Sequence, residues 1–172
     1  MKEGDPFLLK IDRTRSFDPV RFYGKGWTIW RHSPFGHDGL KGDEDEEKSS
    51  LVLKGINFVQ ISFETCLKKG ETVITGDEKI IRHARAGHTQ FDARIAECLL
   101  DEEGWVTLEA VYAGWGMDSF EFTGTRLRSL AGRRAVVCLN RDIDPCGRVR
   151  WRPTYEWISL VVYGRHPSII LA

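Results

Sequence analysis

The last third of the chain contains three segments in which apolar and polar residues alternate, and this pattern constrains the fold most strongly. The segments are SFEFTGTRLRS (119–129), RRAVVCLN (133–140) and GRVRWRPTYEWI (147–158). A period of two places successive side chains on opposite faces of a β-strand. Short turns at 131–132 and 144–147 suit antiparallel neighbours. The pattern therefore predicts a three-stranded meander, with a bulge at Gly124, where the alternation changes register.

Helix signals precede these strands. Thr75-Gly76-Asp77-Glu78 has the form of a capping box, and Gly87 is a favoured residue after a helix C-terminus. A second helix is expected over 90–101 and a shorter third one over 106–113. The second helix would place four apolar residues on one face, at spacings of three and four: Phe91, Ile95, Cys98 and Leu99.

The N-terminal part of the chain gives weaker patterns. Residues 1–16 are expected to form an extended arm, and VRFYGKGWTIWR (20–31) a strand or hairpin edge. Residues 32–50 are expected to form a flexible acidic loop, and alternation within 51–64 favours a strand. Together these elements predict one α+β domain over 1–172. Its antiparallel sheet would end in the three-stranded C-terminal meander, with two or three helices packed on one face.

Composition narrows the class of protein. The 172 residues carry no net charge, and no apolar run approaches the roughly 20 residues of a membrane span. The N-terminal apolar patch is too short for a signal peptide, so we expect a cytoplasmic protein that does not bind membranes. Four cysteines without a CxxC pair argue against structural zinc, and we expect reduced thiols and no cofactor.

The stretch HSPFGHDGLKGDEDEE (32–47) concentrates groups that can bind metal ions. His37 and Asp38 are candidate metal ligands, because imidazole and carboxylate groups bind divalent metals. Their spacing matches no established ligand motif, and the acidic run over 43–47 lacks the spacing of a calcium loop. A hydrated connection, or a contact with a basic partner, explains the same composition.

Arginines near the C-terminus provide the stronger candidate site. Residues 126–172 contain nine arginines against three acids. Arginines that alternate in a strand project from one face about 7 Å apart, where they suit phosphates or carboxylates. The alternative is the solvated face of a sheet. The candidate partner-binding residues are Arg126, Arg128, Arg148, Arg150 and Arg152, with Trp30 and Trp157 adding stacking or apolar contacts.

No catalytic motif is evident. The chain lacks GxSxG, P-loop, HExxH and dinucleotide-binding patterns. The acids of 77–78 and 142–144 are explained by a helix cap and a turn, and pairing Cys146 with His166 has no support from the sequence. We therefore expect a non-catalytic protein. The alternative is a divalent-metal-dependent hydrolase or nuclease built on His37 and Asp38.

Several segments resemble a family of small, uncharacterised bacterial proteins that is frequent in genomes assembled from uncultured organisms. The matching segments are FDPVRFYGKGWTIWR, ETCLKKGETVITGDEK, GHTQFDARIAECL and YEWI, within about residues 17–158. The resemblance implies a shared fold, and it brings no established activity or site residues.

The sequence thus predicts an adaptor or binding protein whose partner is a protein or a nucleic acid. The apolar tail over 159–172 has two possible roles, because it can complete the core or pair with a second subunit in a homodimer.

Overall fold

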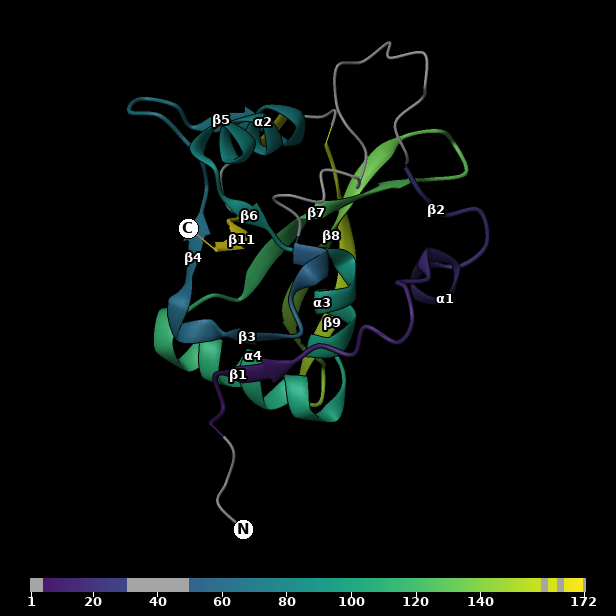
Figure 1. Ribbon diagram of the computed structural model, residues 1–172, viewed down its shortest axis with the longest axis vertical. Coiled ribbons are helices and arrows are strands. Elements are labelled where there is room, and N and C mark those ends of the chain that lie inside the picture. The colour runs from purple at the N-terminus through teal and green to yellow at the C-terminus, as the bar shows by residue number, and fades with distance from the viewer. Residues whose placement is uncertain (1–4, 31–49, 159–160, 164–165, 172) are drawn as a thin grey trace.

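A computed structural model describes residues 5–30, 50–158, 161–163 and 166–171 (Figure 1). Its main sheet has the strand order β4-β11-β7-β8-β9. These strands are β4 (Ile61–Glu64), β11 (Ser168–Leu171), β7 (Ser119–Arg128), β8 (Arg134–Ile143) and β9 (Val149–Trp157). The neighbours are antiparallel except β11 and β7, which are parallel. The α+β class and the C-terminal meander are therefore confirmed.

The bulge expected in β7 is present. The register between β7 and β8 shifts between Phe122 and Arg126. Gly124 lies inside this interval, where a Cβ atom would be 2.4 Å from the carbonyl oxygen of Gln90. That oxygen belongs to β6 (Thr89–Gln90), which pairs with β11. Glycine therefore lets β7 approach the neighbouring backbone closely.

One face of the sheet carries the main hydrophobic core. Helices α3 (Ala93–Leu99) and α4 (Glu102–Trp115) pack there, and the strand pair β1 (Leu8–Lys10) and β3 (Gly55–Asn57) closes the core. Fully buried members include Ile95 and Leu99 from α3, Leu108 and Val111 from α4, and Phe120, Phe122, Val137 and Leu139 from the sheet. Both helices were expected, although α4 is longer than predicted.

Helix α2 (Gly76–Ala86) lies against the opposite face, where Ile80 packs with Val136 and Ile158. Val136 and Val137 are adjacent in β8 and both buried, so this strand needs cover on its two faces. The helices are therefore divided between both faces, whereas the sequence suggested one. Beside α2, β5 (Val73–Thr75) pairs with β10 (Val161–Tyr163).

Both predicted ends of α2 are confirmed. The Thr75 hydroxyl accepts from the backbone N–H of Glu78, and Gly87 has the left-handed conformation. The Glu78 carboxylate accepts from Arg82. That salt bridge replaces the return bond to the cap expected from the capping box.

The expectation of a strand or hairpin edge over 20–31 is wrong for most of that segment. Residues Pro19–Tyr23 form α1, and only Thr28–Ile29 form a strand, β2, which pairs with β7. The Asp18 side chain accepts from the first free amides of α1, and Pro19 occupies an N-terminal position that needs no amide. Local capping therefore outweighs the aromatic, β-branched composition.

Two further N-terminal segments take part in the fold. Leu9 and Ile11 are buried, so the described part of the arm belongs to the core. The segment 51–64 is divided by short 3-10 turns at η2 (Ser50–Val52) and η3 (Phe58–Gln60), which lie on either side of β3.

The C-terminal tail completes the core. Strand β11 lies between β4 and β7, and Ile169 and Ile170 are fully buried. Both edges of β11 are therefore paired within the chain. Among the helices in the described ranges, none is long and apolar enough to cross a membrane.

Candidate functional site

The five candidate arginines of the sheet form two separate groups. Arg126 lies opposite Val136 and Arg152 opposite Asn140, so both project from the face that α2 partly covers. The two β8 partners, Val136 and Asn140, are four positions apart along the strand, which corresponds to roughly 13 Å. Arg128 belongs to the first group, and Arg148 and Arg150 to the second. The single arginine surface expected from the sequence is thus split along the hairpin.

Carboxylates neutralise part of the second group. Arg150 lies 3.5 Å from Asp144, and Arg152 lies 3.7 Å from Asp142. Both guanidinium groups are more than half exposed, so each pair contributes at most about 1 kcal/mol. These arginines remain able to exchange partners, but their local charge is balanced by Asp142 at the end of β8 and by Asp144 in the turn that follows.

A different cluster lies on the core face of the sheet, along β9, which is the last strand in the sheet order of the described residues. Trp27 stacks on Trp157 at 6.0 Å with an interplanar angle of 14°, and Tyr155 lies 4.8 Å from each of these two rings. The Arg133 guanidinium lies 5.6 Å from the centre of the Trp157 ring. This arrangement fits a cation–π contact.

We call this cluster the aromatic–arginine surface. It comprises Trp27, Tyr155 and Trp157 together with Leu130 and Arg133 of the β7–β8 turn region. Leu130 is 84% exposed and Tyr155 41% exposed. Sequence reasoning found Trp157 but missed the other four. The alternation of Trp151, Tyr155 and Trp157 in β9 was the available signal, since all three share one face.

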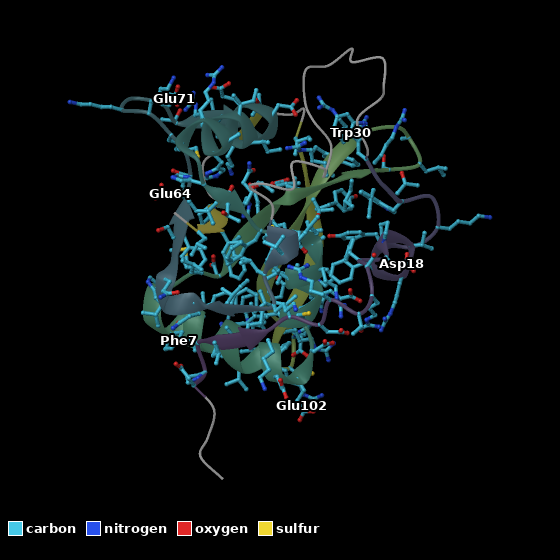
Figure 2. All side chains as sticks on the ribbon, in the orientation of Figure 1. Phe7, Asp18, Trp30, Glu64, Glu71 and Glu102 are labelled. Atoms are coloured by element: carbon cyan, nitrogen blue, oxygen red, sulfur yellow. The ribbon has the colours of Figure 1, made fainter. Side chains whose placement is uncertain are left out.

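The other candidate tryptophan lies close to the first arginine group. The backbone N–H of Trp30 donates to the Arg126 carbonyl at 2.8 Å, and the Arg134 guanidinium lies 5.7 Å from the Trp30 ring centre. Figure 2 shows Trp30 beside the β7–β8 hairpin, far from Glu102. Arg134 also pairs with Asp77 of α2 at 2.8 Å. Trp30 therefore lies against the ion pair of Arg134 and Asp77, which joins β8 to α2.

A polar cluster fills the space between α2 and the sheet. The Lys79 ammonium donates to Glu121 Oε2 and to the His166 carbonyl, both at 2.7 Å. Burial raises the pKa of the Glu121 carboxyl, and the neighbouring Lys79 charge opposes this shift. The His166 ring reaches Ser119 on one side and Glu156 on the other. No sequence pattern predicted this cluster, because its members lie on four separate elements or connections.

Cys66, His83 and His88 also lie together, but their geometry does not suit a metal ion. Cys66 Sγ is 3.4 Å and 3.3 Å from the two ring nitrogens of His83, which places the sulfur over the ring face. Burial lowers the pKa of His83 to about 4 and raises the pKa of Cys66 to about 11. Across the described ranges, no group of three or more His, Cys, Asp or Glu side chains could hold a metal ion.

The predicted metal ligands His37 and Asp38 lie outside the described residues. All four cysteines are free, and Cys146 is exposed.

No protein family, curated protein or solved structure matches this chain. The resemblance to small bacterial proteins therefore stays a prediction.

Proposed function

We propose that this protein binds an acidic, partly apolar segment of a partner protein at the aromatic–arginine surface. The observation that carries the proposal is the placement of Arg133 over Trp157, whose ring lies 4.8 Å from the exposed Tyr155. Tryptophan, tyrosine and arginine supply most of the energy in protein interfaces. We place this binding in the cytoplasm, since the four free thiols suit a reducing compartment.

Charge supports an acidic partner. Within the residues that the structure describes, Arg133 forms no ion pair, whereas Arg150 and Arg152 each face an aspartate. The Arg133 side chain is exposed. Carboxylates of a partner would gain charge-assisted hydrogen bonds there without displacing an internal ion pair.

The same surface is less suited to nucleic acid. Bases stack on free aromatic faces, but Trp27 and Trp157 stack on each other, and Arg133 lies over the Trp157 ring. The chain has no net charge, which weakens general attraction to phosphates. A protein partner can instead pack between Leu130 and Tyr155 while the existing ring contacts remain.

In the test, variants of the full chain are immobilised and each is exposed to a lysate of the source cells. The proteins that each variant retains are then compared. Arg133→Ala and Tyr155→Ala change the proposed surface, while Arg85→Ala removes an exposed arginine of α2 and serves as the matched control. Each retained protein is then purified and titrated against the same variants. We expect wild-type and Arg85→Ala affinities to agree, and each surface variant to lose roughly 30-fold, the effect of a 2 kcal/mol contact.

A nuclease-treated arm separates the partner classes. A ligand released by nuclease, or one whose affinity falls steeply with salt, would assign this surface to nucleic acid and contradict the proposal. Equal binding by wild type, Arg133→Ala and Tyr155→Ala would also contradict it, because the contact would then lie elsewhere.

A further inference from the structure

We propose that Ser119, His166 and Glu156 form a hydrolytic site that cleaves small acyl esters through an acyl-serine intermediate. This activity does not rest on the proposed protein binding. The three side chains meet on the face of the sheet opposite the main core, beside α2. Ser119 begins β7, Glu156 lies in β9, and His166 precedes β11.

The distances arrange the three groups in the order of a nucleophile, a base and an orienting acid. Ser119 Oγ lies 2.5 Å from His166 Nδ1, and His166 Nε2 lies 3.8 Å from Glu156 Oε1. Such a chain is defined by geometry and roles, and either ring nitrogen can serve as the base. Here Nδ1 faces the serine and Nε2 faces the carboxylate.

The Asn140 amide determines whether the Ser119 hydroxyl donates to Asn140 or to His166. Ser119 Oγ donates to Asn140 Oδ1 at 2.6 Å, so the oxygen accepts from Nδ1–H of His166 in this resting arrangement. A half-turn of the Asn140 amide presents N–H in place of the oxygen. The serine hydroxyl then donates to Nδ1, and Nε2–H points toward Glu156. This second arrangement is the reactive one.

Lys79 and Glu121 act as positioning residues for the histidine. Lys79 donates to the His166 carbonyl and to the Glu121 carboxylate. The Lys79 and Glu121 side chains are both almost fully buried. The pair therefore ties the segment before β11 to α2 and to β7. His166 is held at its backbone, while its ring remains 30% exposed and the Glu156 side chain 29% exposed.

The exposure of these groups limits the substrate. Ser119 is only 9% exposed, so a bulky acyl group would not reach its oxygen. Water can reach the partly open His166 ring, which the second half of the reaction requires. A small, unhindered ester meets both conditions.

The reaction balances without any further reagent besides water. Ser119 Oγ attacks the ester carbonyl carbon and its proton passes to His166 Nδ1. The bond from carbon to the leaving oxygen breaks, the alcohol takes that proton, and the acyl group stays on the serine. Water then attacks the acyl-serine with His166 again as base, which releases the acid and restores the hydroxyl.

The test uses the full chain in a Cys146→Ser background, because the exposed thiol of Cys146 would itself react with activated esters. Hydrolysis of 4-nitrophenyl acetate is measured for Ser119→Ala, His166→Gln and Ser129→Ala. Ser129 lies in the β7–β8 turn, outside the proposed site, and is the matched control. We expect Ser119→Ala and His166→Gln to lower the rate by about 100-fold or more, and Ser129→Ala to leave it unchanged.

Two further measurements separate catalysis from a structural role. A fluorophosphonate probe should label the intact protein, and peptide mapping should place the label on Ser119. Glu156→Gln should lower kcat with little change in KM, because the carboxylate lies against the His166 ring and orients it without contacting the ester. Circular dichroism and thermal melting establish that each variant is folded.

Three results would overturn the proposal. The first is hydrolysis no faster than in buffer, and the second is a folded Ser119→Ala protein that keeps the wild-type rate. The third is a label that maps to another residue.

Discussion

Lys79 Nζ lies 2.7 Å from Glu121 Oε2, and the two side chains are 1% and 3% exposed. They join α2 to the central strand β7 across a space that excludes solvent. Removing one charge would leave the other buried and unpaired, at a cost of several kcal/mol. The pair therefore couples the helix on the second face to the sheet.

Replacing one member of this pair should destabilise the fold strongly. We expect Lys79→Met to lower the free energy of unfolding by about 3–5 kcal/mol. The double variant Lys79→Met/Glu121→Leu should lose clearly less than the sum of its two single variants, because no charge remains buried. Urea denaturation of all four proteins measures this coupling. Additive losses would mean that the two charges do not stabilise each other.

The free energy of unfolding should decrease as the pH is lowered, because buried His83 becomes protonated. Its folded-state pKa of about 4 lies below the ordinary value of 6.5, because of burial and then the nearby His88 and Lys79. Between these two values the unfolded state binds more protons. The contribution of His83 is thus complete above pH 6.5 and is lost as the pH falls toward 4, by at most about 1.4 kcal/mol per pH unit.

Urea denaturation of wild type and His83→Gln at pH 7.5, 6, 5 and 4.5 tests this dependence. The difference in unfolding free energy between the two proteins should shrink as the pH falls through this window. A difference that stays constant would assign the acid sensitivity to other groups.

Two glycines of α4 should respond oppositely to alanine. A Cβ at Gly104 would lie 2.2 Å from the Cys98 carbonyl oxygen and 2.4 Å from Leu99 Cα, whereas Gly114 has nothing within 4 Å. Gly104→Ala should cost about 1–3 kcal/mol, because α3 would have to shift. Gly114→Ala should stabilise by about 0.5–1 kcal/mol through helix propensity. Thermal melting of both variants measures the contrast, and equal effects would contradict this close contact.

The C-terminal tail should be essential for stability. Ile170 in β11 is fully buried, while Ile143 at the end of β8 is 66% exposed. We expect Ile170→Ala to lose about 2–5 kcal/mol of unfolding free energy. Ile143→Ala should stay within about 0.5 kcal/mol. If both substitutions were neutral in denaturation experiments, β11 would not form part of the folded core in solution.

Local signals explain why some elements were predictable. The alternation within 119–158 defined the meander, and the cap at Thr75 and the left-handed Gly87 defined α2. These features depend on residues that are close in sequence. The exception is α1, where Asp18 and Pro19 supplied a helix start that the aromatic composition concealed.

The candidate sites depend instead on contacts between distant segments. The expected arginine surface was divided by the strand register, which no single strand encodes. Arg126 in β7 lies opposite Val136 of β8, and Arg152 in β9 lies opposite Asn140, four residues further along β8. Arg133 met Trp157 because the pairing of β8 with β9 places Trp157 opposite Ala135, two residues after Arg133.

By itself, the sequence determined the α+β class, the meander, the bulge at Gly124 and the ends of α2, since alternation and capping act over a few residues. Only the tertiary structure decided that β11 enters the sheet between β4 and β7. The same long-range pairing brought His166 to Ser119. The free energy of that pairing comes from burying residues such as Ile169 against segments far away in the chain, which no local pattern specifies.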